Sequence, residues 1–184
     1  MSHIILEECF IYRSVNERGM AMLQGEWKTI YETYYKPLYL YALSLTGNKQ
    51  DAEDLLQETF VKAYLSYKNT GSIKYWLVIV LRNEFYNFQR KHKKEILEEG
   101  KSFLEREASE EDFLEQLIEK EERRLLFQEI QKLPLQMKEV LIESVYFQMK
   151  DEEIGKLHGI SNENVRKIRS RAKQKLIERM KEGI

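Results

Sequence analysis

Basic side chains crowd the end of this chain in a pattern that favours nucleic-acid binding. Between Arg166 and Lys181 there are eight basic residues and one acidic residue. Arginine and asparagine near the start of a helix can reach base edges in the major groove, whereas lysine and arginine further along meet phosphates. Many charge runs are only solvated helix faces, so the prediction depends on the flanking elements. The candidate DNA contacts are Ser161, Asn162, Asn164, Arg166, Lys167, Arg169, Ser170 and Lys173.

The residues around this basic run predict how it is held. Asp151 is expected to cap a short helix, Gly159 to close it, Ile160 to fill the gap, and Ser161 to cap a long final helix. One apolar stripe of the final helix is formed by Val165, Ile168, Ala172 and Leu176. A short helix, a glycine turn and a long helix with a buried stripe together predict a helix-turn-helix.

Two further groups of side chains stand out in the first half of the chain. Acidic and amide residues crowd two helical turns at 51–58, and periodicity alone would make them an ordinary exposed face. Aromatic residues are frequent at 75–86 and are followed by a basic run at 90–94. Most of these aromatics are expected in a core, although aromatic groups beside cations are also what unpaired bases need.

Catalytic chemistry has little support in this sequence. His3, His92 and His158 lie far apart, without metal-ligand spacing, and the single cysteine, Cys9, has no base nearby. No phosphate-cradling glycine loop and no nucleophile elbow is present. His158 follows a core-facing leucine and is expected to be a packed histidine. The sequence predicts no active site, no metal site and no cofactor.

Composition narrows the fold and the compartment. The chain has 184 residues, enough for one large domain or two small ones, and its eight glycines and two prolines argue against an all-β fold. No apolar run reaches the roughly 18 residues of a membrane span, so no membrane insertion is expected. The first 23 residues do not form a secretory signal. The expected location is the cytoplasm.

The net charge of −1 conceals strong segregation of charge along the chain. Residues 1–26 carry −2, residues 27–94 carry +5, residues 95–122 carry −9 and residues 123–184 carry +5. Local fields rather than the total decide what docks at a surface. Two basic blocks joined by an acidic linker are therefore more informative than the overall neutrality.

Helical periodicity runs through almost the whole chain and predicts an all-α fold. A first helix is expected over residues 27–45, with Pro37 marking a kink or break. A second helix starts near Asn48 or Lys49, residues 68–72 read as a loop, and a third helix runs from about Ile73 to Lys93. Its apolar stretch at 75–81 must lie deep in a core.

The second half is expected to hold more helices after the acidic linker. A capping pattern at 109–112 predicts a helix that continues to Leu133, and Pro134 opens the next helix. The core face of that next helix is predicted to be Met137, Val140, Leu141, Ser144 and Val145. The predicted organisation is an N-terminal extension at 1–25, a three-helix domain at 26–94, a linker at 95–122 and a four-helix domain at 123–184.

Several of these motifs, in this order, resemble the extracytoplasmic-function sigma factors of bacteria. The matching runs are residues 34–39, the ten-residue acidic run at 51–60, Trp76-Leu77, Asn83, Leu133-Pro134, Glu139-Val140-Leu141, Glu152-Glu153-Ile154, Gly159-Ile160-Ser161, Val165 and Arg171-Ala172. The resemblance covers about residues 26–182. The acidic run makes it specific, because many regulators share a helix-turn-helix alone.

The resemblance implies a role for each polar face. Contacts to the clamp helices of the largest RNA polymerase subunit would come from Asp51, Asp54, Gln57 and Glu58. The minus-ten promoter element would be bound and melted by Lys68, Asn69, Ser72, Trp76, Arg82, Asn83, Tyr86, Arg90 and Lys91, with the 68–72 loop and Asn83 receiving a flipped base. The final helix would read the minus-thirty-five element. The resemblance also implies a cognate anti-sigma factor.

Some positions depart from the family pattern. Asn87 stands where the family often has aspartate, Ile73 where phenylalanine is usual, Asn164 where threonine is common and His158 where leucine is usual. The order Ile168-Arg169 inverts a common one. These departures bear on which promoter sequence is read. Residues 1–19 extend beyond the usual family start, as a regulatory arm or a leader ahead of a later start at Met20 or Met22.

The sequence therefore leaves two hypotheses for the function. The primary hypothesis is a non-enzymatic subunit that binds core RNA polymerase, recognises promoter DNA and opens it. The alternative is a helix-turn-helix regulator that acts without polymerase docking, with residues 27–94 as a dimerisation or ligand module. The acidic run at 51–60 discriminates between them, because a repressor does not need it. A helical adaptor or anti-sigma-like protein is disfavoured by the two basic blocks.

Overall fold

The computed structural model describes residues 21–67, 71–99 and 121–182, and no strand occurs among them. The all-α prediction is confirmed for this part of the chain. In chain order the elements are α2 (Ala21–Thr46), α3 (Lys49–Ser66), α4 (Ile73–Glu99), α6 (Glu121–Gln131), α7 (Leu135–Leu141), the π-helical η2 (Ile142–Tyr146), α8 (Asp151–His158) and α9 (Asn162–Glu182).

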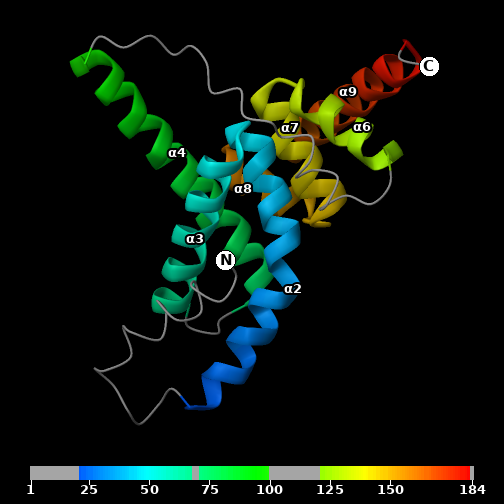
Figure 1. The fold of residues 1–184 in the computed structure, drawn as a ribbon. Coiled ribbons are helices and arrows are strands. Elements are labelled where there is room, and N and C mark those ends of the chain that lie inside the picture. The colour runs from blue at the N-terminus through cyan, green and yellow to red at the C-terminus, as the bar shows by residue number, and fades with distance from the viewer. Residues whose placement is uncertain (1–20, 68–70, 100–120, 183–184) are drawn as a thin grey trace.

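Among the described residues, α2, α3 and α4 form the N-terminal domain (Figure 1). Pro37 lies inside α2 without ending it, so the break that was one of the expectations does not occur. α3 starts at Lys49 as expected, because the Asn48 side chain accepts the Asp51 N–H at 2.8 Å and caps the helix. α2 begins at Ala21, inside the predicted N-terminal extension, and α4 continues to Glu99, beyond the expected end near Lys93.

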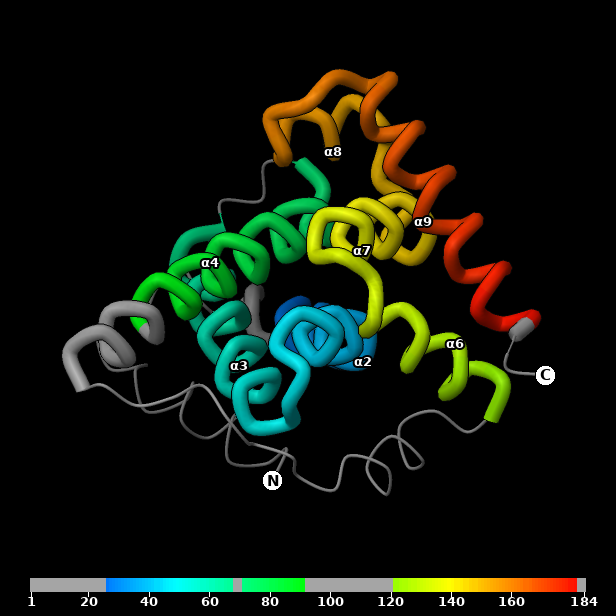
Figure 2. Tube along the Cα trace, turned by 90° about the horizontal axis from the view of Figure 1, so that it is seen from above, coloured from blue at the N-terminus to red at the C-terminus, as the bar shows by residue number. Residues whose placement is uncertain are grey.

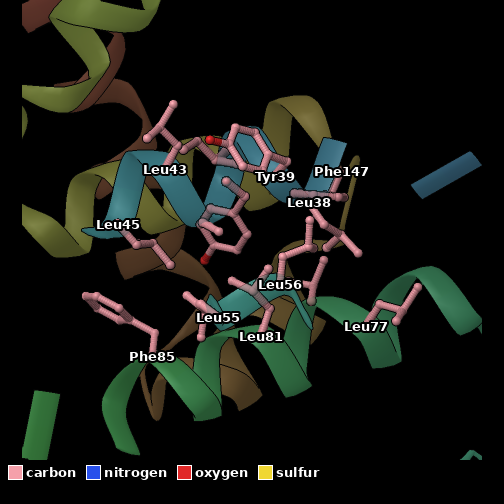
Figure 3. Packing of buried hydrophobic residues seen from close by; sticks show 14 of the residues in the cluster. Leu38, Tyr39, Leu43, Leu45, Leu55, Leu56, Leu77, Leu81, Phe85 and Phe147 are labelled. Carbon is pink, nitrogen blue, oxygen red and sulfur yellow. The ribbon is translucent and has the colours of Figure 1, made fainter. Parts of the chain in front are cut away.

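Large apolar side chains from all three helices meet in the core of this domain. Tyr39 and Leu43 from α2, Leu56 from α3, and Leu81 and Phe85 from α4 are each at most 2% exposed. Figure 3 shows where these buried side chains lie on α2, α3 and α4. Burying each of them contributes about 1.5–3 kcal/mol. Because the apolar faces point inward, the polar faces of α3 and α4 point outward.

The C-terminal domain contains α6, α7, η2, α8 and α9. α6 ends at Gln131, slightly before the expected Leu133, and α7 starts directly after Pro134 as the sequence predicts. The capping pattern at 109–112 lies outside the described residues. Leu133, Leu141, Ala172 and Leu176 form a small buried cluster that joins α7 to α9.

The prediction that Val145 is a core residue is wrong, because the helix changes its winding there. In η2 the Phe147 N–H donates to the Ile142 carbonyl at 3.0 Å, five residues earlier. This wider turn rotates the following residues about the axis. Val145 is therefore 50% exposed while Phe147 is only 3% exposed. The Phe147 ring lies 5.6 Å from the ring of Tyr41 in α2.

The two domains pack against each other, and one hydrophobic cluster contains buried residues of both. α7 lies against α2 on one side and α9 on the other, and Figure 2 shows α4 passing beside the C-terminal domain. At this contact the Lys138 Nζ donates to the Ser44 carbonyl at 2.5 Å. Desolvation on burial lowers the pKa of Lys138. Charged groups thus reach into the boundary between the domains.

Candidate nucleic-acid interface

The α8–α9 turn closes at Gly159 as the sequence predicts, and it is built by close backbone packing. Gly159 ends α8 with a φ of 66°, in the left-handed region that favours glycine. A Cβ on Gly155 would lie 2.8 Å from the Ile160 carbonyl oxygen, so α8 and the turn can approach only because this residue has no side chain. The Asn164 N–H donates to the Ser161 Oγ at 3.2 Å, which caps α9.

One stripe of α9 is buried and the rest of the helix faces outward. Of the predicted stripe, Val165 and Ala172 are fully buried and Leu176 is 7% exposed, whereas Ile168 is partly buried against the core. The exposed candidates on this helix and its cap are Ser161, Asn162, Asn164, Arg166, Lys167, Ser170 and Lys173. Arg169 is only partly exposed. The structure therefore gathers the predicted DNA contacts of α9 on one accessible helix.

Asp151 is the acidic partner of two of these arginines. Its Oδ2 accepts from Arg166 Nε at 3.2 Å and from Arg169 Nη2 at 3.4 Å, and its Oδ1 accepts from Arg169 Nη1. The Arg169 hydrogen bond is the main reason that the pKa of Asp151 is lowered. Sequence reasoning treated Asp151 only as a helix cap. In the structure the N-cap position is Lys150, and Asp151 is the first residue of α8.

The predicted polymerase-binding residues lie on α3, opposite its buried face. Asp54 and Glu58 are exposed, and Asp51 and Gln57 are partly exposed. Each acid has a local partner: the Asn48 Nδ2 donates to Asp51, the Gln50 Nε2 donates to Asp54 at 3.2 Å, and Lys62 lies 3.2 Å from Glu58. The buried face of the same helix is formed by Ala52, Leu55, Leu56, Thr59, Phe60 and Ala63.

The predicted minus-ten residues separate into two groups. Lys68 and Asn69 lie outside the described residues. The exposed members of the set are Ser72, Asn83, Arg90 and Lys91. Trp76 is partly buried, with its ring edge-on to Tyr67 at 5.6 Å. Arg82 and Tyr86 instead face the C-terminal domain, so the structure does not bring the whole set to one open surface.

Arg82 bridges α4 to the C-terminal domain. Its Nε donates to Glu139 Oε1 at 3.0 Å, its Nη1 to the Leu157 carbonyl at 3.2 Å, and its Nη2 to His158 Nδ1 at 3.3 Å. The Tyr86 hydroxyl lies 3.1 Å from both Glu139 oxygens and donates to this carboxylate. The Glu139 side chain is 1% exposed and that of Arg82 14%. Burial raises the pKa of Glu139.

A second buried carboxylate, Glu143, lies beside the first. Its Oε1 accepts from the Tyr41 hydroxyl at 2.9 Å and its Oε2 from His158 Nε2 at 2.7 Å. Because Arg82 can only donate, this geometry fits the His158 tautomer that carries its proton on Nε2. Burial, followed by the nearby Glu143 charge, raises the pKa of Tyr41 well above its usual value. The prediction of a packed histidine at 158 agrees with its 2% side-chain exposure.

Sequence reasoning missed Glu139 and Glu143 as functional candidates. They are spaced by four residues, and Glu139 directly precedes apolar Val140 and Leu141. Two acids on what becomes a buried helix face were an available signal, because buried carboxylates need partners. The partners themselves come from α2, α4 and α8, which no local pattern could reveal.

The described residues offer little for other chemistry. No group of three or more histidine, cysteine, aspartate or glutamate residues there could hold a metal ion. None of the described helices combines the length and the apolar character needed to cross a membrane. A groove of about 650 Å³ lies between α2, α6, η2 and α9. Its lining is mainly apolar, and the basic residues along it are Lys36, Arg123 and Lys173.

Comparison with protein families and curated proteins gives consistent matches. Residues 30–95 match the model for Sigma-70 region 2, and residues 123–176 match the model for Sigma-70, region 4. RNA polymerase sigma factor YlaC of Bacillus subtilis (strain 168) is 30% identical over 158 residues, which cover 82% of this chain and 90% of YlaC. ECF RNA polymerase sigma factor SigM of the same organism is 49% identical over 70 residues, covering 36% of this chain and 42% of SigM.

Two of the solved structures that match this chain illustrate the shared fold. The sigma factor RpoE, in complex with the anti-sigma factor NepR from Bartonella quintana, has a TM-score of 0.66 and 24% identity, covering 85% of this chain and 97% of that chain. CnrH, in complex with the cytosolic domain of CnrY, has a TM-score of 0.58 and 18% identity, covering 86% and 89%. At these identities the likeness is one of fold.

Proposed function

Because this chain belongs to the extracytoplasmic-function family of RNA polymerase sigma factors, we propose that it docks on core polymerase through α3 and binds promoter DNA through α4 and α9. The family acts in transcription initiation and is not a class of enzymes. The observation that carries the residue assignments is the presence, in one chain, of an acidic docking face on α3 and a basic recognition helix. A regulator acting without polymerase is not favoured.

The docking face consists of Asp51, Asp54, Gln57 and Glu58. These side chains lie on the outer face of a helix whose inner face is locked into the core by Leu55, Leu56 and Phe60. A rigid helix presents the acids at fixed spacing, which favours a basic or amide-rich partner surface. The clamp helices of the largest polymerase subunit are the proposed partner.

The minus-ten element is proposed to bind along residues 68–72 and α4. Asn83 is exposed for contact with a base that leaves the stack, and Arg90 and Lys91 are exposed for phosphates. Extruding a base costs a few kcal/mol, offset by contacts that only the extruded base can make. Arg82 would join the phosphate contacts, which requires it to leave Glu139.

The minus-thirty-five element is proposed to bind α9. Arg166 and Arg169 are the candidates for base-edge contacts, and Lys167, Ser170 and Lys173 are candidates for the backbone. A bidentate arginine–guanine pair is worth about 1–3 kcal/mol of discrimination. Replacing a phosphate contact instead weakens binding about equally on all sequences.

Run-off transcription tests this proposal. The purified chain is added to core polymerase on sheared fragments of the genome that encodes it, and transcript ends are mapped. The proposal predicts discrete start sites that depend on the chain. Absence of promoter-dependent initiation on every fragment would contradict it.

A pair of substitutions tests the docking face separately. Gln57→Ala with Glu58→Ala should reduce co-purification with core polymerase while helical content and melting temperature stay close to wild type. The matched control is Gln174→Ala with Glu178→Ala, which removes an exposed glutamine and glutamate four residues apart on α9. If both double variants retain polymerase equally well, the α3 assignment is wrong.

An anti-sigma factor is the proposed regulatory partner. Both structural neighbours were solved in complexes, one of them with an anti-sigma factor by name and the other with the cytosolic domain of CnrY. The groove between α2, α6, η2 and α9 is apolar and bordered by Lys36, Arg123 and Lys173. An amphipathic helix with acidic flanks would complement it. The cytoplasm, where polymerase and promoter DNA meet, is the proposed location.

A further inference from the structure

The same arginine has two competing partners in this chain. Arg82 lies on α4, within the set that is proposed to contact minus-ten DNA, so the inference rests on the proposed function. In the structure its guanidinium is instead engaged by Glu139, the Leu157 carbonyl and His158, all from the C-terminal domain. Tyr86 lies one turn further along α4, and its hydroxyl donates a hydrogen bond to the same carboxylate. The Arg82 Cζ lies 4.8 Å from the centroid of the Tyr86 ring.

The burial of the acids shows that this contact is part of the packed boundary between the domains. Glu139 is 1% exposed and Glu143 is fully buried. A buried carboxylate is costly unless a cation or hydrogen-bond donors compensate it. For Glu139 the guanidinium and the tyrosine hydroxyl both come from α4. The C-terminal domain therefore depends on α4 to satisfy its own buried acid.

A carboxylate and a phosphate can bind the same guanidinium in similar ways and therefore compete for it. Both are anionic groups with adjacent oxygens that accept the N–H donors of arginine. A phosphate of the DNA backbone that bound Arg82 would have to occupy space that Glu139 fills here. Since the C-terminal domain covers the Arg82 side chain to 14% exposure, the two domains must separate before DNA can reach it.

We propose that Glu139 is an internal competitor of nucleic acid: in the free chain it occupies Arg82 and Tyr86, so that α4 engages DNA only after the domains separate. The Tyr41–Glu143 and Lys138–Ser44 hydrogen bonds set the same closed geometry without occupying a proposed DNA contact. Glu139 is thus the residue at which closure and DNA binding exclude each other.

Glu139→Gln in the full-length chain tests the proposal, because it removes the charge and keeps the size. Two quantities are measured: the radius of gyration by small-angle X-ray scattering, and the affinity for a fluorescein-labelled single-stranded dT20 oligonucleotide. The variant should have a larger radius of gyration and bind the oligonucleotide about tenfold more tightly, the scale expected for losing a charge-assisted bond. Glu152→Gln is the matched control, because Glu152 is an exposed acid paired within α8 to Lys156. It should change neither quantity.

Two further variants make the result specific. Adding Arg82→Ala to Glu139→Gln should remove the gain in oligonucleotide affinity, because the gain is assigned to Arg82. Tyr86→Phe removes one donor to Glu139 and keeps the ring, so it should enlarge the radius of gyration by less than Glu139→Gln does. It also tests the proposal if Glu139→Gln fails to fold. Circular dichroism establishes which variants are folded.

The outcomes separate this proposal from the proposed function. Unchanged radii of gyration for folded Glu139→Gln and Tyr86→Phe would overturn the competition, whatever the transcription assay gives. A larger radius without tighter oligonucleotide binding would also overturn it. Run-off transcription by the wild-type chain tests the proposed function separately. If the chain initiates transcription but one of these two outcomes is found, only the competition by Glu139 is refuted. If the chain does not initiate transcription, the proposed function is refuted.

Discussion

Two arginine–carboxylate clusters in this chain use the same chemistry in opposite surroundings. On the helix-turn-helix, Asp151 pairs with Arg166 and Arg169, and its side chain is 24% exposed. Between the domains, Glu139 pairs with Arg82 and is 1% exposed. The arginines of both clusters lie on helices proposed to contact promoter DNA. Only the first cluster faces solvent while the chain is closed.

The difference in solvent access sets how easily each cluster can exchange its acid for a DNA phosphate. Exposed ion pairs contribute about 0–1 kcal/mol, so Asp151 can release its arginines at little cost. Removing one partner of a buried pair costs about 3–5 kcal/mol, because the other charge is left uncompensated. We therefore expect α9 to be ready for DNA in the free chain and α4 to be held back.

The largest predicted effect comes from breaking the buried cluster. Arg82→Ala should lower the free energy of unfolding by about 3 kcal/mol, because it leaves the buried Glu139 carboxylate between the domains without its cationic partner. Equilibrium urea unfolding measures this, with Arg90→Ala on the exposed part of α4 as the control, expected within about 0.5 kcal/mol of wild type. Equal losses for the two variants would show that the Arg82–Glu139 pair does not hold the domains.

The next effect concerns the backbone packing that presents the exposed cluster. Gly155→Ala should cost about 1–3 kcal/mol, because the new Cβ would meet the Ile160 carbonyl at 2.8 Å. Thermal unfolding and binding to duplex DNA should both be impaired. Lys156→Ala, at the adjacent exposed position, should behave like wild type. A stable Gly155→Ala variant with normal duplex binding would mean that α8 and α9 do not need this close approach.

The boundary between the domains should also respond to alkaline pH. The pKa of Tyr41 is raised in the folded chain, so its contribution to stability is complete below its ordinary pKa of about 10 and is lost as pH rises further. Tyr41→Phe should cost about 1–2 kcal/mol at pH 8, since Glu143 loses a donor. The gap between wild type and variant should narrow above pH 10. A gap that stays constant from pH 8 to pH 11 would exclude a role for Tyr41 ionisation.

The smallest effect on stability is expected from the exposed cluster itself. Asp151→Asn should cost less than about 1 kcal/mol. Because the acid holds Arg166 and Arg169 in place, its loss should raise affinity for scrambled duplexes and reduce the preference for a promoter fragment. Fluorescence anisotropy over a range of salt concentrations measures both. Glu163→Gln, which removes the acid paired with Lys167 on α9, is the control. An unchanged preference for the promoter fragment would remove Asp151 from the recognition site.

The two clusters also show what the sequence could and could not predict. The helix-turn-helix was predictable, because Gly159, Ser161 and the Val165 stripe are local signals within one short segment. The Arg82–Glu139 pair was not, since 57 positions separate the two residues and only the packing of α4 on α7 joins them. The π-helical turn at η2 reversed the expectation for Val145, because periodicity analysis assumes a constant number of residues per turn.

The α3 face lies between these cases. Its position was predictable from the alternation of buried Leu55, Leu56 and Phe60 with acidic residues. What binds there could not be derived from that pattern, which any amphipathic helix shares, and the assignment depended on family resemblance. For Glu139 the sequence offered a signal of a buried acid, but its competing role depends on partners from another domain that no local pattern reveals.

In the proposed competition the closed chain holds α4 away from DNA until the two domains separate, and the complex with core polymerase is the state in which they are expected to be separate. The most direct test is the distance between two spin labels, placed at Leu65→Cys in α3 and Ile177→Cys in α9 with Cys9→Ser, in the free chain and on core polymerase. Both label positions are more than half exposed. We predict a single distance in the free chain and a longer one on polymerase. The same distance in both states would refute the proposed opening, because Arg82 would then remain covered in the complex that must melt DNA.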